Sequence, residues 1–380
     1  MGGTVFGVIG GYGSTGRVVL SELHKSCEAQ ILVGGRDLAK ANALAAEYSN
    51  RVTAGQVDAF EARSLDEFCD RCSIVVNCAG PVKRLQDRVA QAAFRNRRHY
   101  VDLAGMTFIK ERMLPHASEI ADRGLSFVVS AGWTPGLTEL LPVYAHEQAR
   151  SQMDSVELLT VFYSDSGEWS ASALRDGVWF LRRTGLPKPG YFRKGEWVRA
   201  GMTGASRKLH FGAARGARRF SLFTMPETID LGRQLNECDV FVYTYVPGFR
   251  NMIAVARIAL LPVKEEAGIR LLGEVFRRNR LSVRGFVVAV AVGRSGGQQR
   301  TFRSQIVFRD GQDYWINGIV PATVARLIAE GRIVRPGLNY LSAAVDPIAF
   351  MAELRKAGVQ QTEDWNLAGM SDALRSCTIS

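Results

Sequence analysis

The sequence predicts an α/β protein that has a Rossmann-type, doubly wound parallel sheet and a second, α+β domain. Three observations support this class. A glycine-rich turn follows the first apolar run, apolar strands alternate with helical segments over the first 150 residues, and strand-like segments dominate beyond that point. Alternating strands and helices are typical of a parallel sheet with helices on both faces.

The glycine turn places the first strand and the first helix next to each other. An apolar run at residues 5–9 ends in glycines, and an amphipathic helix is predicted from Val18. The spacing G-x-G-x-x-G allows a tight turn, a close backbone approach to a pyrophosphate, and close packing of helix on strand. The free N–H groups of the helix start attract the same anion. We therefore expect a dinucleotide to contact Gly11, Tyr12, Gly13, Ser14, Thr15 and Gly16.

The end of the second predicted strand, residues 30–36, indicates which dinucleotide binds. Rossmann folds usually place an acidic residue there to hold the ribose 2′-hydroxyl. This chain has Gly35, which leaves room, and it has Arg36 and Lys40, whose charges suit a 2′-phosphate. The sequence therefore predicts that NADP(H) is preferred over NAD(H). Asp37 argues against this preference, and a solvated arginine at the strand end is the alternative interpretation of Arg36.

The remaining segments of the first domain continue the alternation. Helices are predicted at 38–48, 64–70, 84–96, 113–123 and 138–150, and strands at 52–57, 73–81, 99–103 and 125–130. Ser64 is expected to cap its helix, with Glu67 at the capping-box position. The apolar strand from 73 ends in small residues that permit close approach of a cofactor, namely Asn77, Cys78, Ala79, Gly80 and Pro81. Asp58 is expected either near the adenine or as a turn residue.

Beyond residue 150 the pattern predicts one half-exposed antiparallel sheet. Its strands are expected at 155–163, 221–224, 240–246, 284–292 and 299–309, with helices at 171–184, 250–261 and 269–279. A last domain helix is predicted at 321–330, followed by a turn and a helix that begins at Pro347.

Composition narrows the class of protein. The chain has 380 residues, of which 47% are hydrophobic and 22% charged, as in ordinary globular proteins. No apolar run approaches the ~18 residues of a membrane span and no leader pattern is recognised, so a cytoplasmic location is expected. Six scattered cysteines indicate reduced thiols, and the single pair Cys69 and Cys72 is interpreted as buried helix-end residues rather than a metal site.

The net charge of +11 is concentrated in residues 175–219, which contain twelve Lys and Arg residues against Asp176 and Glu196. Aromatic residues are interleaved with these charges. Such a mixture suits an acidic substrate, an acidic partner or, less well here, nucleic acid. A solvated, mobile excursion over the active site is the alternative.

Four motifs together resemble the saccharopine dehydrogenase family, in its saccharopine-reductase-like branch. They are GGYGSTGR, VVNCAGP, HYVDLAG and GWTPGLTELLP, in that order along the chain. The resemblance implies a dinucleotide-binding domain at 1–137 that is completed by 320–380. It also implies an inserted α+β domain at 138–319 for substrate binding and dimerisation, and NAD(P)-dependent chemistry at a carbon–nitrogen bond. Met106 and Thr134 stand where relatives carry acidic residues, which argues against saccharopine itself as the substrate.

Five residues are candidates for the chemistry. Tyr100 and Asp102 lie on one face at the end of a strand, beside the crevice where ligands of such sheets bind, and Asp102 is the leading acid–base candidate. The alternative for Asp102 is a cap on the turn at Gly105. Thr134 and Glu139 lie near the mouth of the sheet, although Glu139 also suits the first turn of a helix. Lys83 is expected either to orient a carboxylate or to be solvated.

Three functions fit these features. The first is an NADPH-dependent reductase or dehydrogenase that forms or cleaves a secondary amine, using an amino acid, amine or oxo-acid substrate, in a homodimer. The second is a C=C or C=O reductase whose basic segment at 175–219 docks an acidic carrier protein. The third is a non-catalytic protein that senses NADP(H) or acts as a scaffold. No metal is expected in any of them.

Overall fold

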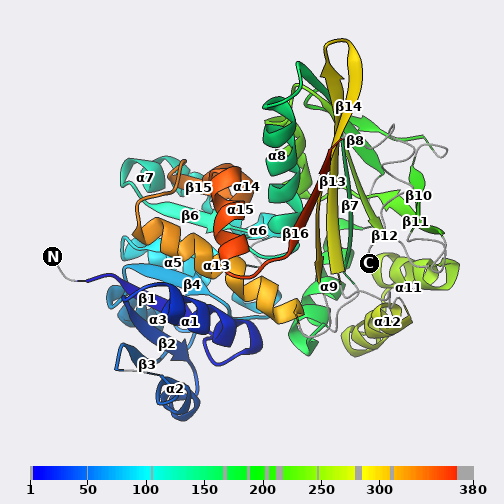
Figure 1. Cartoon of the computed structure of the whole chain (residues 1–380). Coiled ribbons are helices and arrows are strands. Elements are labelled where there is room, and N and C mark those ends of the chain that lie inside the picture. The colour runs from blue at the N-terminus through cyan, green and yellow to red at the C-terminus, as the bar shows by residue number, and fades with distance from the viewer. Residues whose placement is uncertain are drawn as a thin grey trace. The chain divides into compact units, whose positions relative to one another are not determined.

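The computed structural model describes residues 3–48, 50–103, 106–165, 169–185, 189–201, 205–210, 217–245, 248–278, 285–308 and 312–365. The chain forms two compact units (Figure 1). The first combines Met1–Leu137 with Tyr314–Ala357, and the second combines Thr138–Asp313 with Gly358–Ser380. The predicted division instead assigned all of 320–380 to the first domain. The difference arises because β16 (Gln361–Trp365) pairs with a strand of the second sheet.

The first unit contains a seven-stranded sheet in the order β15-β6-β5-β4-β1-β2-β3. All neighbouring strands are parallel, and Figure 1 shows helices on both faces. The strands are β1 (Val5–Ile9), β2 (Gln30–Gly35), β3 (Val52–Gln56), β4 (Ile74–Asn77), β5 (His99–Asp102), β6 (Ser126–Val129) and β15 (Gly337–Tyr340). This arrangement confirms the predicted doubly wound sheet. The strand order reverses between the neighbouring strands β1 and β4, so the ligand crevice of such a sheet lies there.

The helices of this unit differ in detail from the prediction. They are α1 (Ser14–Ser26), α2 (Leu38–Ala45), α3 (Ala62–Asp70), α4 (Val82–Leu85), α5 (Arg88–Arg95), α6 (Met106–Met113), the 3₁₀ turn Leu114–His116 and α7 (Ala117–Asp122). The predicted helix at 84–96 is two helices, because Gln86 has a φ of 53° and interrupts it. Ser64 does not cap α3. Its hydroxyl accepts a hydrogen bond from the Asp58 N–H at 2.9 Å, and the helix begins two residues earlier.

The C-terminal part of the chain completes the first unit. It adds β15 beside β6, together with α13 (Asp313–Ala329), α14 (Leu341–Ala344) and α15 (Pro347–Lys356). A Cβ at Gly318 of α13 would lie 2.5 Å from the Val18 Cβ on α1, so the two helices are in backbone-close contact. Arg326 of α13 also forms an ion pair at 2.6 Å with Glu353 of α15. The pKa of Glu353 falls to about 2, since Lys356 and Arg326 outweigh the opposing effect of its burial.

The second unit contains a nine-stranded sheet whose main path is β10-β11-β12-β7-β13-β14-β16. Its strands are β7 (Ser155–Asp165), β8 (Gly190–Arg193), β9 (Glu196–Arg199), β10 (Ser206–His210), β11 (Ala217–Leu222), β12 (Asp239–Tyr245), β13 (Gly285–Ser295), β14 (Gln298–Phe308) and β16. The sheet is mainly antiparallel, as predicted, and β12 and β7 are parallel neighbours within it. More than seventy residues connect these two strands, and this length permits a crossover. The predicted ends at Val246, Asn279, Arg284 and Arg309 lie outside the described residues.

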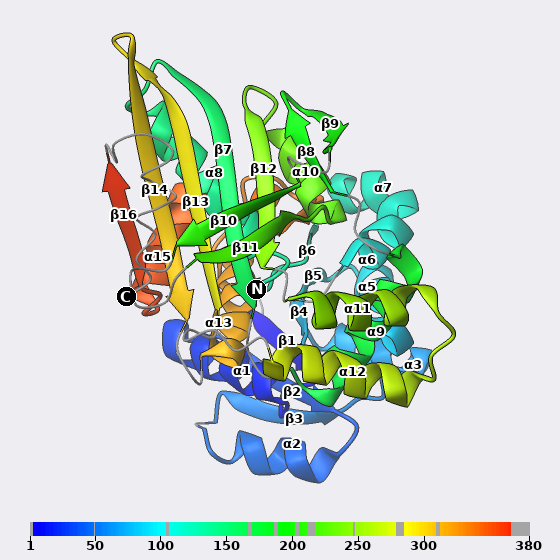
Figure 2. The same ribbon diagram turned by 90° about the vertical axis from the view of Figure 1, so that its right-hand side faces the viewer.

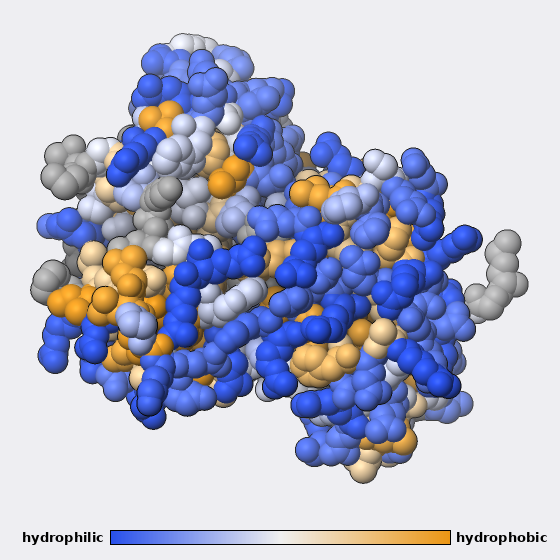
Figure 3. Space-filling model, turned by 180° about the vertical axis from the view of Figure 1, so that it is seen from behind, coloured by the Kyte–Doolittle hydropathy of each residue, from blue (hydrophilic) through white to orange (hydrophobic). Residues whose placement is uncertain are grey.

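The helices of the second unit are α8 (Leu137–Arg150), α9 (Ala171–Thr184), α10 (Pro226–Gln234), α11 (Phe249–Leu260) and α12 (Glu265–Arg278). Val178, Ile258 and Leu272 join α9, α11 and α12 into one apolar cluster. The outer side of α11 exposes apolar side chains, and Figure 3 shows apolar surface gathered over this region at the left of the view. They are Met252, Ile253, Leu260 and, just after the helix, Leu261.

Most described residues of the basic segment lie in a helix and in strands of the second sheet. Its described residues form α9 and the strands β8 to β11, and Figure 2 shows β10 and β11 crossing in front of β7 and β13. The described residues of the segment therefore have regular secondary structure. Its strands cover an apolar cluster that includes Phe162, Phe220 and Phe286.

The cysteine pair packs in the core of the first unit. Cys69 and Cys72 are free and buried, and burial raises the pKa of each thiol to about 12. A Cβ at Gly7 would lie 2.3 Å from the Cys72 sulfur, so this thiol fills the space left by that glycine. No group of side chains in the described residues could hold a metal ion. None of the described helices is long and apolar enough to cross a membrane.

The helix contact at Gly318 leads to a prediction about stability. Gly318→Ala should lower the free energy of unfolding by about 1–3 kcal/mol, because the added methyl group overlaps α1. Gly273→Ala on α12 is the matched control. Its Cβ meets nothing closer than 3.5 Å, so it should stabilise the chain by roughly 0.5–1 kcal/mol through the helix propensity of alanine. Urea unfolding followed by circular dichroism measures both, and equal stabilities would contradict the argument.

Candidate functional site

The glycine turn joins β1 to α1 through backbone contacts. The N–H groups of Gly10 and Gly11 donate to the Gly34 carbonyl at 2.9 and 3.1 Å, and the Gly13 N–H donates to the Gly10 carbonyl at 3.0 Å. Gly10, with a φ of 77°, has the positive φ of this turn, one residue before the glycine that the motif indicated. Gly13 occupies the N-cap position of α1, so no side chain caps the first turn of the helix. The N–H groups at the start of α1 therefore lack a side-chain cap, as an anion site requires.

The space beside each glycine of the turn shows which of them leaves room for a pyrophosphate. A Cβ at Gly16 would lie 2.3 Å from the Gly10 carbonyl oxygen, so this glycine is required by the packing of helix on turn. A Cβ at Gly13 would meet only that oxygen, at 3.2 Å, and would otherwise point into open space. Gly13 therefore leaves room at the helix start that a side chain would fill. The residues present fit a dinucleotide pyrophosphate.

The end of β2 is arranged around Tyr12. A Cβ at Gly35 would lie 2.2 Å from the Tyr12 ring, and the Asp37 N–H donates to the Tyr12 hydroxyl at 3.2 Å. Asp37 caps α2 by accepting from the Lys40 N–H at 3.1 Å, a hydrogen bond that lowers the pKa of its carboxyl. Arg36 is exposed. The acidic residue that argued against a 2′-phosphate is thus engaged as a helix cap, while the neighbouring arginine faces solvent.

The segment after β4 meets the glycine turn. A Cβ at Gly10 would lie 2.9 Å from both the Ala79 nitrogen and the Cys78 carbonyl carbon, so the two backbones are in contact. Burial, together with the charge of Asp102, raises the pKa of the Cys78 thiol, which stays protonated. Gly80 is exposed and Pro81 half-buried. Asp58 accepts from the Phe60 N–H at 2.9 Å and so closes a turn at the end of β3.

Three polar side chains form a buried group at the carboxyl ends of β4 and β5. The Tyr100 hydroxyl donates to Asp102 Oδ2 at 2.6 Å, and Asn77 Nδ2 donates to the same oxygen at 2.8 Å. Asn77 Oδ1 accepts from the Ala79 N–H at 3.1 Å, which ties the group to the loop after β4. Burial and the neighbouring Asp102 charge hold the pKa of Tyr100 well above its usual value, so the phenol keeps its proton. The structure therefore places Tyr100 and Asp102 on one face, as strand alternation predicted.

The loop after β6 is held by a residue far along the chain. Ser130 is buried with a φ of 54°, an unusual backbone conformation for a residue other than glycine. The Trp133 N–H donates at 2.9 Å to the side-chain oxygen of Asn317 on α13, 184 residues away. Thr134 is half-buried in this loop. Neither Ser130 nor Asn317 was predicted, because local sequence carries no signal for a contact over that separation.

The remaining candidates lie apart in the fold. Lys83 is half-buried on the short helix α4, two residues after Pro81. Glu139 belongs to the second unit, where it accepts from the Thr138 hydroxyl at 2.8 Å in the first turn of α8. Within that unit, burial and then the charge of Glu139 raise the pKa of Tyr163. The turn at Gly105 lies outside the described residues.

The parallel sheet, the open helix start and the close backbone turn define the first unit as a Rossmann-type dinucleotide-binding domain. Residues 6–128 match the family model described as the saccharopine dehydrogenase NADP binding domain. The resemblance predicted from the four motifs is therefore confirmed, and this part of the chain is similar to the NADP-binding domain of saccharopine dehydrogenases.

Similar proteins agree with this assignment. A human saccharopine dehydrogenase-like oxidoreductase is 26% identical over 118 residues, which are 30% of this chain and 27% of that protein. The rat protein of the same description is 25% identical over 205 residues, or 49% of this chain and 47% of its own. The matched segments thus span less than half the length of these relatives. The structure of saccharopine dehydrogenase (L-Glu forming) from Saccharomyces cerevisiae covers 96% of this chain and 100% of that chain, with a TM-score of 0.67 and 16% identity, and confirms the fold.

Gly13 and Gly16 lead to a prediction that distinguishes an effect on cofactor binding from an effect on stability. Gly13→Val should abolish NADPH binding without unfolding the protein, because its side chain occupies the space of the pyrophosphate. Gly16→Ala should instead lower the melting temperature, because its methyl group overlaps the turn itself. Calorimetric titration and thermal unfolding of both variants measure these effects. Normal NADPH binding by Gly13→Val would show that the turn is only structural.

Proposed function

We propose that this chain is an NADP(H)-dependent oxidoreductase that acts on a carbon–nitrogen bond. The reaction is imine reduction, reductive amination or the reverse, and the substrate is an amino acid, an amine or an oxo acid. The observation that carries the proposal is the match of residues 6–128 to the saccharopine dehydrogenase NADP binding domain. The buried polar group beside the glycine turn supports it, since acid–base chemistry needs a carboxylate near the cofactor crevice.

In the proposed mechanism the chain's residues orient the reactants and move a proton. When bound, the reduced nicotinamide supplies a hydride for the carbon of the C=N bond. The nitrogen gains a proton, and we assign its delivery to Asp102 in its protonated form; the carboxylate that is left accepts a hydrogen bond from the Tyr100 hydroxyl, at 2.6 Å. Asn77 orients the same oxygen and anchors the loop at Ala79. Thr134, Glu139 and Lys83 remain candidates for orienting the substrate.

A substrate screen tests the reaction class. Oxidation of NADPH by mixtures of oxo acids with amino acids or amines is the expected result. Turnover only with a substrate on an acidic carrier protein would favour the C=C or C=O reductase, docked through the basic segment. Binding of NADPH without any turnover would favour a sensing or scaffold protein.

The preference for NADP(H) predicts that removing the charge of Arg36 weakens NADPH binding more than NADH binding. Arg36→Ala should weaken NADPH binding roughly tenfold or more and leave NADH nearly unchanged, because a charge-assisted contact with the 2′-phosphate is worth about 1.5–3 kcal/mol. Arg63→Ala, which removes an exposed cation of α3 that pairs with Glu67, is the control. Calorimetric titration with both dinucleotides measures the effect. Equal weakening of NADPH and NADH would exclude Arg36 as the phosphate contact.

The role of Asp102 predicts a loss of turnover. Asp102→Asn should lower turnover about 10²–10⁴-fold and leave NADPH affinity within a few-fold, because the amide preserves the shape of the side chain but not its basicity. Tyr100→Phe is the matched variant, since it keeps the ring and removes only the hydroxyl that donates to Asp102. Full turnover with a lowered melting temperature would assign Asp102 a structural role and direct the search to Glu139 and Lys83.

We also propose a cytoplasmic homodimer. The exposed apolar side chains on α11 support self-association, because exposed apolar patches commonly mark protein interfaces. Light scattering of the purified chain should give twice the mass of 41.8 kDa for one chain. A mass of one chain would contradict the dimer.

A further inference from the structure

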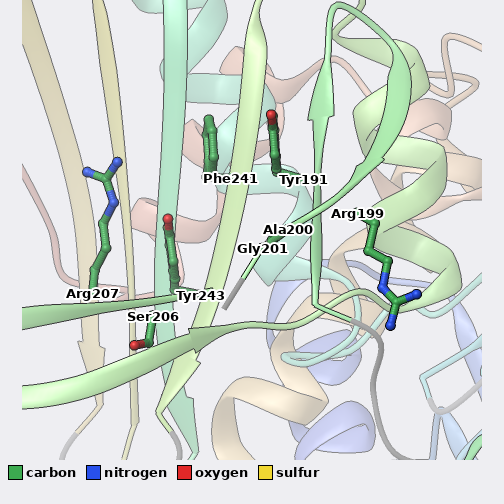
Figure 4. A pocket seen from close by; sticks show the side chains of 8 residues that line it. All are labelled: Tyr191, Arg199, Ala200, Gly201, Ser206, Arg207, Phe241 and Tyr243. Atoms are coloured by element: carbon green, nitrogen blue, oxygen red, sulfur yellow. The ribbon is translucent and has the colours of Figure 1, made fainter. Parts of the chain in front are cut away.

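The second unit contains a cavity of about 420 Å³ that the redox proposal does not use. Residues of β8, β9, β10 and β12 surround it, with the two residues that follow β9. The lining residues are Tyr191, Arg199, Ala200, Gly201, Ser206, Arg207, Phe241 and Tyr243 (Figure 4). Its volume lies within the range of small-molecule sites.

Three aromatic rings form one wall of this cavity. Phe241 and Tyr243 share a face of β12 because they are two residues apart, and their rings are nearly parallel at 7° with centroids 6.3 Å apart. Tyr191 of the neighbouring strand β8 stacks on Phe241 at 4.4 Å and 8°. In Figure 4 these rings stand side by side and point the same way as the Arg207 side chain. The wall is therefore flat, apolar and preformed.

Arg207 supplies a positive charge at the end of this wall. Its guanidinium carbon lies 5.9 Å from the ring centroids of both Phe241 and Tyr243, which holds it by cation–π attraction. Among the residues that the structure describes, no carboxylate forms an ion pair with Arg207 or Arg199. The planar fork of Arg207 thus keeps donors for an anion.

The Tyr243 hydroxyl is the second observation that points to a ligand. Tyr243 is 0% exposed, and its hydroxyl oxygen has no hydrogen-bond partner within the described part of the chain. A buried hydroxyl without a partner costs free energy, so native structures usually satisfy such groups. The charge of Arg207 lies close enough to oppose the rise in the Tyr243 pKa that burial causes. In Figure 4 the side chains of Tyr243 and Arg207 point the same way.

We propose that this cavity binds a small carboxylic acid with a planar aromatic or conjugated body. The carboxylate accepts hydrogen bonds from Arg207 and from the Tyr243 hydroxyl, and the planar body packs against the rings of Phe241 and Tyr191. This assignment stands independently of the redox reaction.

Binding of trans-cinnamate to the full chain, without NADPH, tests the site by calorimetry and saturation-transfer NMR. Cinnamate should bind at least tenfold more tightly than cinnamamide, which lacks the charge, and than acetate, which lacks the planar body. Failure of cinnamate to bind would overturn the proposal and leave the redox proposal untouched.

Variants locate the site. Arg207→Gln should weaken cinnamate at least tenfold, whereas Lys208→Gln should not, because Lys208 is the next residue of β10 and is exposed on the opposite face. Tyr243→Phe should weaken cinnamate several-fold and raise the melting temperature, because it removes the unpartnered hydroxyl. Unchanged affinity in Arg207→Gln, or affinity retained by Tyr243→Phe together with higher stability, would show that the cavity is not the binding site.

Discussion

The close contact of backbones at the glycine turn is the constraint on which the first unit depends. Gly16 lies against the Gly10 carbonyl where no Cβ fits, and Gly10 lies against the backbone of Cys78 and Ala79. The start of α1, the end of β1 and the loop after β4 are therefore fixed together without side chains between them. At Gly318 there is again no room for a Cβ, because α13 packs closely on α1 at that position. A C-terminal segment far along the chain is thus required to cover the first helix.

A buried polar group stabilises the other side of the crevice. Asp102 accepts hydrogen bonds from Tyr100 and Asn77, and the Asn77 side chain also accepts a hydrogen bond from the Ala79 N–H. Buried carboxylates are costly unless they are hydrogen-bonded. The group therefore links the ends of β4 and β5. Through Asn77 it also connects the Asp102 carboxylate to the loop after β4, which contacts the glycine turn.

In the second unit, alternation along short strands sorts the side chains of the basic segment. On β10, Arg207 and buried Leu209 face the aromatic cluster, while Lys208 is exposed. The sequence shows only that cations and aromatic residues are mixed between 175 and 219. Strand geometry separates them, so that one arginine lies beside the rings of β12 and most of the remaining charge faces solvent.

The sequence by itself determined the elements whose pattern is local. The strands β1, β2, β3, β5 and β6 lie within one residue of their predicted bounds, and β4 ends four residues early, because a buried parallel strand is a continuous apolar run between turn residues. Strand alternation also placed Tyr100 and Asp102 on one face. Several short elements escaped prediction, among them β15, β16 and the strands β8 to β10, because four or five residues carry too little periodicity to distinguish a strand from a loop.

Tertiary structure alone decided which distant segments pair. The parallel contact of β12 with β7, the placement of β16 beside β14, and the hydrogen bond from Trp133 to Asn317 all join residues far apart in the chain. It also decided that Tyr12 packs on Gly35 and that the Tyr243 hydroxyl is buried without a partner. The physical reason is that periodicity records how much of a segment is buried, whereas the partner that buries it is selected by packing over the whole chain.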